Sequence, residues 1–412
     1  MNKTVFKLMA LSVALAVCPD LPQAHAAIDG VTGTTFNFSA RDGSIATPDG
    51  GSYYMWGYAE DPNGMQYPGP TMIVEEDVAI TINLTNTLTV PVSMVFPGQT
   101  GVTATGGSPG LLTSEADPNG GTVSYSFTPT EPGTYMYYSG TNPELQIEMG
   151  LVGALIVRPT GAPGQAYAHA DSAYDHEILF LETEMDADIH DLVEQGEIGQ
   201  VDFTTWRPVY WFFNGRCALD TVSAPGVPWL PHQPYNCLTI MHPGEKVLLR
   251  FISAGRDSHP QHPHGNNVYV IARDGRLLES APGAGADLAS TINTISVPPG
   301  GTLDCIFTWT GAKLGWDIYG HDPNDPLEPH EYAPDHGKPF PVVLPSLQDL
   351  AFGVLWSGSP FLGVQNALPP GEGLLNPGGA YVHIWHSHHE KEVVNNDIFP
   401  GGMISFVLIL PH

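Results

Sequence analysis

Short apolar stretches separated by glycine and proline constrain this chain more than any other feature. Helical periodicity is scarce, and runs of alternating or β-branched residues recur between turn residues. The clearest runs are residues 78–84, 122–127, 153–157, 246–252, 294–297 and 404–410. Such runs are typical of β-sandwiches. Hydrophobic residues make up 42% of the chain, enough to bury a sizeable core. The sequence therefore predicts an all-β fold.

The order of the parts repeats within the chain. Residues 71–98 and 238–265 each contain a strand, an acidic turn, a second strand and a short segment that ends in glycine. Residues 133–157 and 380–409 parallel each other further along the two halves. A repeated order of elements indicates two related sandwiches rather than one large sheet.

The repeat and the composition together predict the domain boundaries. We expect an N-terminal sandwich at residues 27–160 and a C-terminal sandwich at 176–412, joined by a linker at 161–175 that is rich in glycine, proline and alanine. Residues 320–379 are rich in proline, glycine and aspartate, so they predict a long loop insertion in the second sandwich.

The N-terminus has the features of a targeting segment. Lys3 and Lys7 precede an apolar run at residues 8–17, and Ala24-His25-Ala26 supplies a small-x-small cleavage pattern. We expect residues 1–26 to be a signal peptide and the protein to be exported, to the periplasm or outside the cell. No later segment has 18 unbroken apolar residues, so we expect no membrane span.

The charge of the chain limits the classes of molecule that it can bind, and its cysteines bear on disulfide formation. Acidic residues outnumber basic ones 43 to 14, for a net charge of −29, so nucleic-acid binding is disfavoured. Such a surface favours a cationic metal or small-molecule substrate, or a basic redox protein. In an oxidising compartment Cys217 and Cys237 can pair, whereas Cys305 lies in an apolar, alternating stretch and is expected to be a buried thiol.

Two His-x-His pairs carry the strongest chemical signal. They are His262-Pro263-His264 and His386-Ser387-His388. On a strand, residues i and i+2 point to the same face, so two neighbouring strands can bring four imidazoles to one or two metal ions. Imidazole ligands without carboxylates favour copper or zinc. His259 could add an outer ligand. The competing interpretation is that these histidines form hydrogen bonds with loops or are merely exposed to solvent.

The predicted loop insertion carries a second group of potential ligands. A hard or borderline cation could bind there, but a polar loop with its charges in water is the more common arrangement. The group comprises His321, Asp322, Asp325, Glu328, His330, Asp335 and His336.

Four segments resemble multicopper oxidases. "HPQHPHGNNVYVIARDGR" (259–276) and "WHSHHEKEVVNNDIFPGGM" (385–403) are similar to the histidine-rich segments of the last domain of that family. "PGPTMIVEEDVAITINLTN" (68–86) and "GLVGALIVRP" (150–159) resemble the framework of its first domain. The resemblance covers most of the chain after the signal peptide. It implies two cupredoxin-like Greek-key β-sandwiches and a copper cofactor.

The chain departs from the family at most of the positions that bind copper. The two His-x-His pairs of the family's first domain are replaced by Val95-Phe96-Pro97 and Tyr138-Ser139-Gly140. At the blue-copper site, Ser387 stands at the cysteine position, Glu392 at a histidine position and Asp397 at the methionine position. A blue-copper centre needs a thiolate ligand. The resemblance therefore implies half of a trinuclear cluster and no blue-copper centre.

Three functions stay open at this point. The first is a copper-dependent oxidoreductase with a mono- or dinuclear copper site at His262, His264, His386 and His388. The second is a non-catalytic copper-binding or delivery protein, and the third is a metal-free structural or interaction module. Two-domain relatives often form trimers, so a homotrimer is an open alternative, although the first domain has no ligands to lend to a neighbour.

Overall fold

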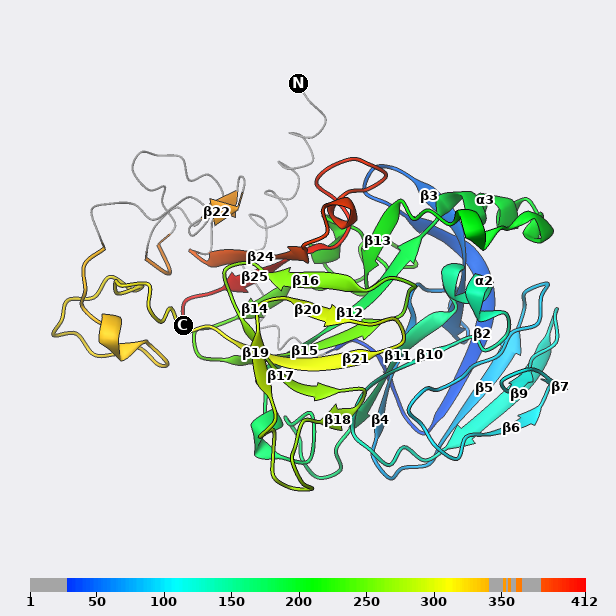
Figure 1. Cartoon of the computed structure of the whole chain (residues 1–412), viewed down its shortest axis with the longest axis horizontal. Helices are drawn as coiled ribbons and strands as arrows, with labels where there is room; N and C mark the ends of the chain where they lie inside the picture. The colour runs from blue at the N-terminus through cyan, green and yellow to red at the C-terminus, as the bar shows by residue number, and fades with distance from the viewer. Residues whose placement is uncertain (1–27, 341–350, 353–354, 357–360, 365–378) are drawn as a thin grey trace.

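The computed structural model describes residues 28–340, 351–352, 355–356, 361–364 and 379–412. The predicted signal peptide and much of the predicted loop insertion lie outside these residues. The described chain consists mainly of strands in four large sheets and two short hairpins (Figure 1), so the all-β prediction is confirmed. Among the described residues, no helix has the length and apolar character needed to cross a membrane.

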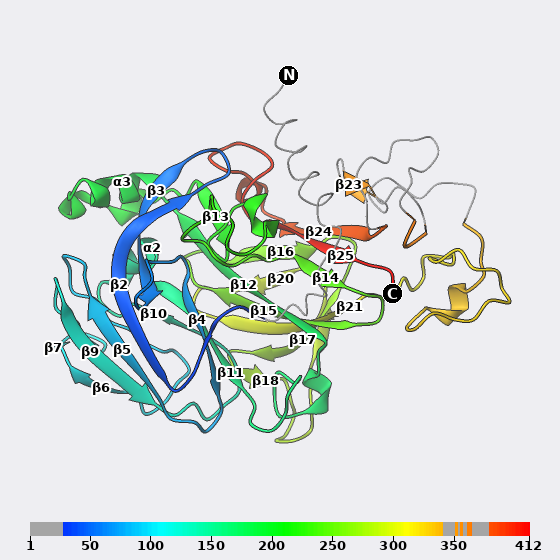
Figure 2. The same ribbon diagram turned by 180° about the vertical axis from the view of Figure 1, so that it is seen from behind.

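Two sheets are built from the N-terminal part of the chain. The first has the order β1 (Val31–Thr32), β4 (Gly69–Glu75), β11 (Val152–Arg158) and β10 (Gly133–Tyr138). The second has the order β3 (Ser52–Glu60), β2 (Thr35–Ala46), β5 (Ile80–Asn86), β9 (Gly121–Phe127) and β6 (Thr103–Gly106). The long strand β2 curves through this half between β3 and β5 (Figure 2).

Two further sheets are built from the C-terminal part. The larger has the order β13 (Tyr210–Phe213), β12 (His176–Met185), β15 (Lys246–Ser253), β21 (Thr302–Thr308), β17 (Val268–Arg273) and β18 (Arg276–Leu277), with β19 (Ser290–Ile292) also paired to β17. The other has the order β14 (Thr239–Met241), β25 (Ile404–Ile409), β24 (Tyr381–Ser387), β16 (His259–Pro263) and β20 (Ile295–Val297).

Helices and hairpins are minor elements of the described chain. The helices are α2 (Pro143–Glu148) and α3 (Ala187–Glu194). The two hairpins pair β7 (Ser108–Pro109) with β8 (Ser114–Glu115) and β22 (Ala351–Phe352) with β23 (Leu355–Trp356).

Alternation of side chains explains how each pair of sheets closes on a core. Along β5 and β9, buried residues alternate with partly exposed ones, as expected for strands with one face on the core. Phe38, Tyr58 and Tyr125 are fully buried in the N-terminal core, and Phe251, Phe307 and Trp385 are buried in the C-terminal core.

The repeat seen in the sequence reappears in the strand pairing. In the N-terminal half β4 runs parallel to β11, which is antiparallel to β10. In the C-terminal half β14 runs parallel to β25, which is antiparallel to β24. The two halves therefore place corresponding segments of sequence at corresponding positions in their sheets.

A buried ionic network joins the two halves. The fully buried guanidinium of Arg250 lies 3.1 Å from Glu177 and 3.6 Å from Asp304, and it donates a 2.9 Å hydrogen bond to Thr134 of the N-terminal half. Arg158, also from the N-terminal half, forms a bidentate pair with Glu177. Because each buried charge has an opposite charge beside it, the network fixes how the halves meet.

The disulfide between Cys217 and Cys237 that the sequence allows is not formed. Both thiols are free and buried, and they donate to different backbone carbonyls, Cys217 to Trp211 at 3.3 Å and Cys237 to Thr221 at 3.6 Å. They pack in different apolar clusters, so no disulfide joins them. Cys305 is buried in the C-terminal core, as predicted.

Candidate metal centre

The two His-x-His pairs lie on neighbouring antiparallel strands. His262 on β16 is directly opposite His386 on β24 in the strand register. The hydrogen-bonded pairing continues one step past the strand ends, because the His264 amide donates to Ile384 at 3.1 Å and the His388 amide donates to Pro260 at 2.8 Å. All four imidazoles therefore come to one side of this two-strand unit.

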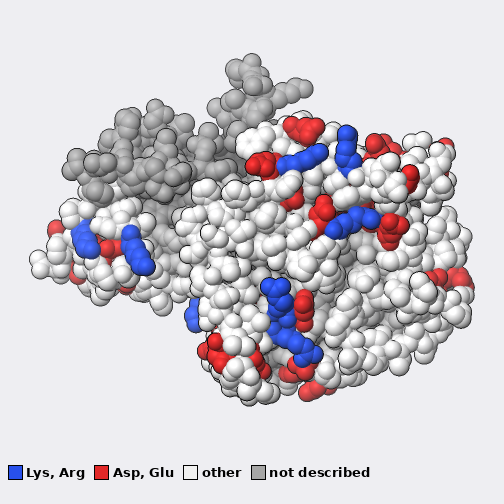
Figure 3. Space-filling view, viewed as in Figure 1, with Lys and Arg blue, Asp and Glu red and all other residues white. Residues whose placement is uncertain are grey.

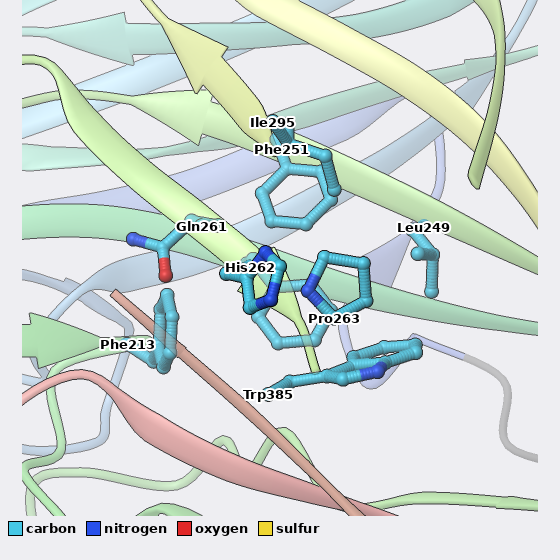
Figure 4. Close-up of a pocket in the computed structure, with 9 residues that line it drawn as sticks. Phe213, Leu249, Phe251, Gln261, His262, Pro263, Ile295 and Trp385 are labelled. Atoms are coloured by element: carbon cyan, nitrogen blue, oxygen red, sulfur yellow. The ribbon is translucent and has the colours of Figure 1, made fainter. Parts of the chain in front are cut away.

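The inward-pointing residues of β16 hold this arrangement in place. Gln261 and Pro263 are buried, whereas His262 is partly exposed and His264 is exposed. A small pocket next to His262 is lined by apolar side chains that include Phe251, Ile295 and Trp385 (Figure 4). The histidines thus stand on the outer side of a strand whose other side packs on the core.

The four rings form two triangles that share one edge. The shared edge is the 5.7 Å separation of the His262 and His386 ring centres. His264 completes one triangle, at 5.6 Å from His262 and 5.7 Å from His386. His388 completes the other, at 5.2 Å and 5.8 Å from the same two rings. Two triads of imidazoles suit one metal ion or a pair of ions.

The nitrogen atoms fit a metal in spacing and in orientation. Nδ1 of His264 and Nε2 of His386 lie 3.4 Å apart, close to the separation of about 3.3 Å between two ligands bound tetrahedrally at about 2.0 Å. Nδ1 of His262 is 2.8 Å from the Asn293 carbonyl, and Nδ1 of His386 is 2.7 Å from the Ser387 carbonyl. Such carbonyl contacts orient a metal-binding imidazole and leave its Nε2 available.

Two of the four histidines are kept neutral by their surroundings. Burial is the first cause that lowers the pKa of His262 and of His386, and the nearby imidazoles lower both pKa values further. A neutral imidazole has the free lone pair that a metal requires. Burial also lowers the pKa of His383, on the same strand as His386, to about 4.

The N-terminal half has the same geometry without the ligands. Val95 and Tyr138, which occupy the positions of the missing His-x-His pairs, face each other in a two-way backbone bridge of 2.8 Å and 3.2 Å. The ring of Phe96 packs against Tyr125 and Tyr137. The register of the pairs is thus kept without imidazoles, and the intervening Phe96 packs in the N-terminal core.

The structure does not bring His259 to the four-histidine group. Its ring is fully buried between two carboxylates, with Nδ1 3.1 Å from Glu392 and Nε2 3.7 Å from Glu184. Burial alone would lower the pKa of His259, but the carboxylates outweigh it and raise that pKa to about 11. His259 is therefore an imidazolium at neutral pH, and its nitrogens face oxygen atoms.

Two of the other blue-copper positions, Ser387 and Glu392, are linked to this imidazolium. The Ser387 hydroxyl donates a hydrogen bond to Glu392, so the residues at the cysteine position and at one histidine position bind each other. A further buried carboxylate, Glu182, has no hydrogen-bond partner on either oxygen, and burial raises its pKa to about 8. An internal cation with its counter-charges occupies the region where the family binds blue copper.

Sequence reasoning missed the two carboxylates of β12. Glu182 and Glu184 lie in the run "FLETEM", where apolar neighbours predict burial for the whole strand. Glutamate is almost never fully buried unless it is paired. Two glutamates in an otherwise apolar strand were therefore a readable signal of an internal ion pair.

Exposed charges are mixed on the face shown in Figure 3. Lysine and arginine side chains lie beside aspartate and glutamate side chains there, and the surface between these groups is uncharged. The described part of this face therefore has no broad basic surface of the kind that a phosphate backbone requires.

Comparisons with known proteins support the resemblance read from the sequence. Residues 43–162 match the family model for multicopper oxidases. This segment contains Val95 and Tyr138 and none of the four clustered histidines. No curated protein matches the sequence. The resemblance to multicopper oxidases is confirmed, and it extends over the half of the chain that lacks ligands.

Solved structures share the fold of the whole described chain. The blue copper oxidase from Nitrosomonas europaea has 18% identity and a TM-score of 0.58, with 92% of this chain and 85% of that chain covered. The multicopper oxidase mgLAC has 18% identity and a TM-score of 0.57, with 92% and 86% covered. The copper nitrite reductase from Nitrosomonas europaea has 16% identity and a TM-score of 0.50, with 92% and 94% covered. The prediction of two cupredoxin-like sandwiches is confirmed.

Proposed function

We propose that this chain, which has the fold of multicopper oxidases and resembles that family, is an exported copper-binding oxidoreductase. His262, His264, His386 and His388 would hold one or two copper ions. The observation that carries the proposal is the placement of four imidazoles on adjacent strands, with ring centres 5.2–5.8 Å apart. Copper bound to imidazole supplies one-electron redox chemistry and Lewis acidity.

The openness of the group supports direct contact between substrate and site. His264 and His388 are exposed, whereas His262 and His386 are half-buried. The outer pair would admit a substrate and the inner pair, fixed by the Asn293 and Ser387 carbonyls, would keep the site in place. The net charge of −29 favours a cationic substrate such as a reduced metal ion.

The replaced blue-copper site favours a second candidate, a copper-delivery protein. Ser387 cannot supply the thiolate through which the family passes electrons, and His259 is paired with Glu184 and Glu392. Without that entry point, exposed ligands could serve to accept and release copper. The two candidates share a site and differ in turnover.

Copper stoichiometry tests the shared part of the proposal. We expect the chain from Ala27 onward to bind one or two copper ions, measured by mass spectrometry and electron paramagnetic resonance. The double variant His386→Ala/His388→Ala should lose them. His389→Ala is the matched control, because His389 follows directly in sequence but its side chain is 59% exposed and lies near Glu392. Stoichiometric copper that survives the double variant would refute the site.

Turnover separates the oxidoreductase from the carrier. Oxygen consumption with ferrous or cuprous ions should occur in the copper-loaded protein and disappear in the double variant. Copper transfer to a chelator without any oxygen consumption would support delivery instead. Export itself is tested by the N-terminal sequence of the protein recovered from the periplasm or the medium, which we expect to begin at Ala27.

A further inference from the structure

The loop between β21 and β24 contains a second group of potential metal ligands. In Figures 1 and 2 its described part, residues 310–340, projects from the C-terminal sandwich on the side away from β5, β6 and β9. Asp317, His321, Glu331 and His336 each offer one ligand atom, and these atoms all lie within 4.8 Å of one another. None of these residues belongs to the four-histidine group.

Three of the four nitrogen–oxygen distances within the group suit ligands around a common centre, and the fourth is a hydrogen bond between His336 and Glu331. Nδ1 of His321 lies 3.5 Å from Asp317 and 3.7 Å from Glu331. Nδ1 of His336 lies 3.5 Å from Asp317 and 2.8 Å from Glu331. Two imidazoles and two carboxylates thus alternate around one point, the ligand mixture that borderline divalent metal ions accept.

Burial makes the group costly without a cation. The Asp317 side chain is 0% exposed and the Glu331 side chain is 3% exposed. Among the ion pairs of the described residues neither has a lysine or arginine partner, since Lys338 pairs with Asp335. The Nδ1 atom of His321 is buried and has no hydrogen-bond partner. Buried carboxylates are normally paired or bound to a metal.

The backbone holds both carboxylates in position. The amides of Tyr319 and Gly337 donate 2.8 Å hydrogen bonds to the two oxygens of Asp317, and the amide of Glu328 donates to Glu331 at 2.8 Å. Nε2 of His336 lies 2.9 Å from the Asp325 carbonyl, the contact that orients a ligand imidazole. The ligands are therefore preorganised by the loop's own turns.

We propose that Asp317, His321, Glu331 and His336 bind one divalent transition-metal ion, with zinc the best match to two nitrogen and two oxygen ligands. The ion would neutralise the buried carboxylates and tie the two ends of the 317–336 segment together. This proposal does not rest on copper binding or on oxidoreductase activity.

Zinc binding to the chain from Ala27 onward tests the proposal, with the His386→Ala/His388→Ala background used to weaken the four-histidine group. We expect one zinc ion per chain by calorimetry in this background. Adding His321→Gln and Glu331→Gln should weaken that binding by at least about 100-fold. The matched control is His330→Gln, because His330 lies in the same loop but its ring packs near His412, outside the group.

A second readout keeps the test independent of global folding. Zinc should slow proteolytic cleavage within residues 310–340 of the background protein and have no such effect in the loop variant, while circular dichroism confirms the β-fold of both. If the loop variant binds zinc as tightly as the background protein, or if the background protein binds none, the proposal is wrong. Loss of copper binding elsewhere would leave the result unaffected.

Discussion

Replacement of Glu182 by glutamine should remove a large pH dependence of stability. Glu182 is fully buried on β12, and neither of its oxygens has a hydrogen-bond partner. Burial penalises the charged form and raises its pKa from 4.5 to about 8. The folded protein therefore keeps a proton on Glu182 at pH values at which the unfolded chain has lost it.

The sign and the size follow from linkage. The stabilising effect of the raised pKa is fully present below pH 4.5 and is lost as the pH rises through about 8. Each pKa unit corresponds to about 1.36 kcal/mol, so the wild type should lose about 5 kcal/mol of unfolding free energy over this interval through Glu182. A glutamine at this position is neutral throughout and avoids the loss.

Equilibrium urea unfolding from pH 4.5 to pH 8 measures the difference. We expect Glu182→Gln to gain stability relative to wild type by about 1.4 kcal/mol for each pH unit, and subtraction removes the titration of all other groups. Glu144→Gln is the control, because the Glu144 side chain is 57% exposed. Parallel pH profiles for wild type and Glu182→Gln would refute the reasoning.

Three other outcomes follow from the buried groups. Arg250→Met should lower the free energy of unfolding by about 3–5 kcal/mol, because the buried Asp304 loses its cation and Glu177 keeps only Arg158, and a loss below about 1 kcal/mol in urea unfolding would contradict this. The lowered pKa values of His262 and His386 should let copper remain bound below pH 6.5 during dialysis, whereas half-loss above pH 6.5 would contradict the assignment. Cys217, Cys237 and Cys305 should react with a thiol reagent only after unfolding, as three thiols in the chain from Ala27 onward, and any rapid reaction of the folded protein would count against their burial.

Strand positions were predictable because their physical cause is local. The run at 246–252 corresponds to β15 (Lys246–Ser253), and the run at 404–410 corresponds to β25 (Ile404–Ile409). The order of parts that repeats in the sequence also matches the repeated pairing of β4 with β11 and of β14 with β25. Alternation and turn residues are enough to predict such elements. The absent Cys217–Cys237 disulfide was not predictable, because it depends on how distant loops pack.

The sites were predictable to the extent that their ligands are neighbours in sequence. Spacing alone indicated that His262 and His264 share a face, but their register opposite His386 depends on the pairing of β16 with β24. The loop residues His321 and His336 were recognised as potential ligands. Asp317 and Glu331 were not, because their burial is set by turns that bring residues 317 and 336 together.

The positive charge of His259 affects whether this region of the protein can fold before any metal binds. In a site whose buried ligands need a metal, folding waits for the metal or traps it. Here the positive charge belongs to a side chain of the protein, between Glu184 and Glu392. No metal ion has to bind to supply it. In a variant that lacks the loop ligands His321 and Glu331, a chelator present during refolding should therefore leave the yield of the C-terminal sandwich unchanged. If the four-histidine group binds copper as proposed, copper binding then follows folding.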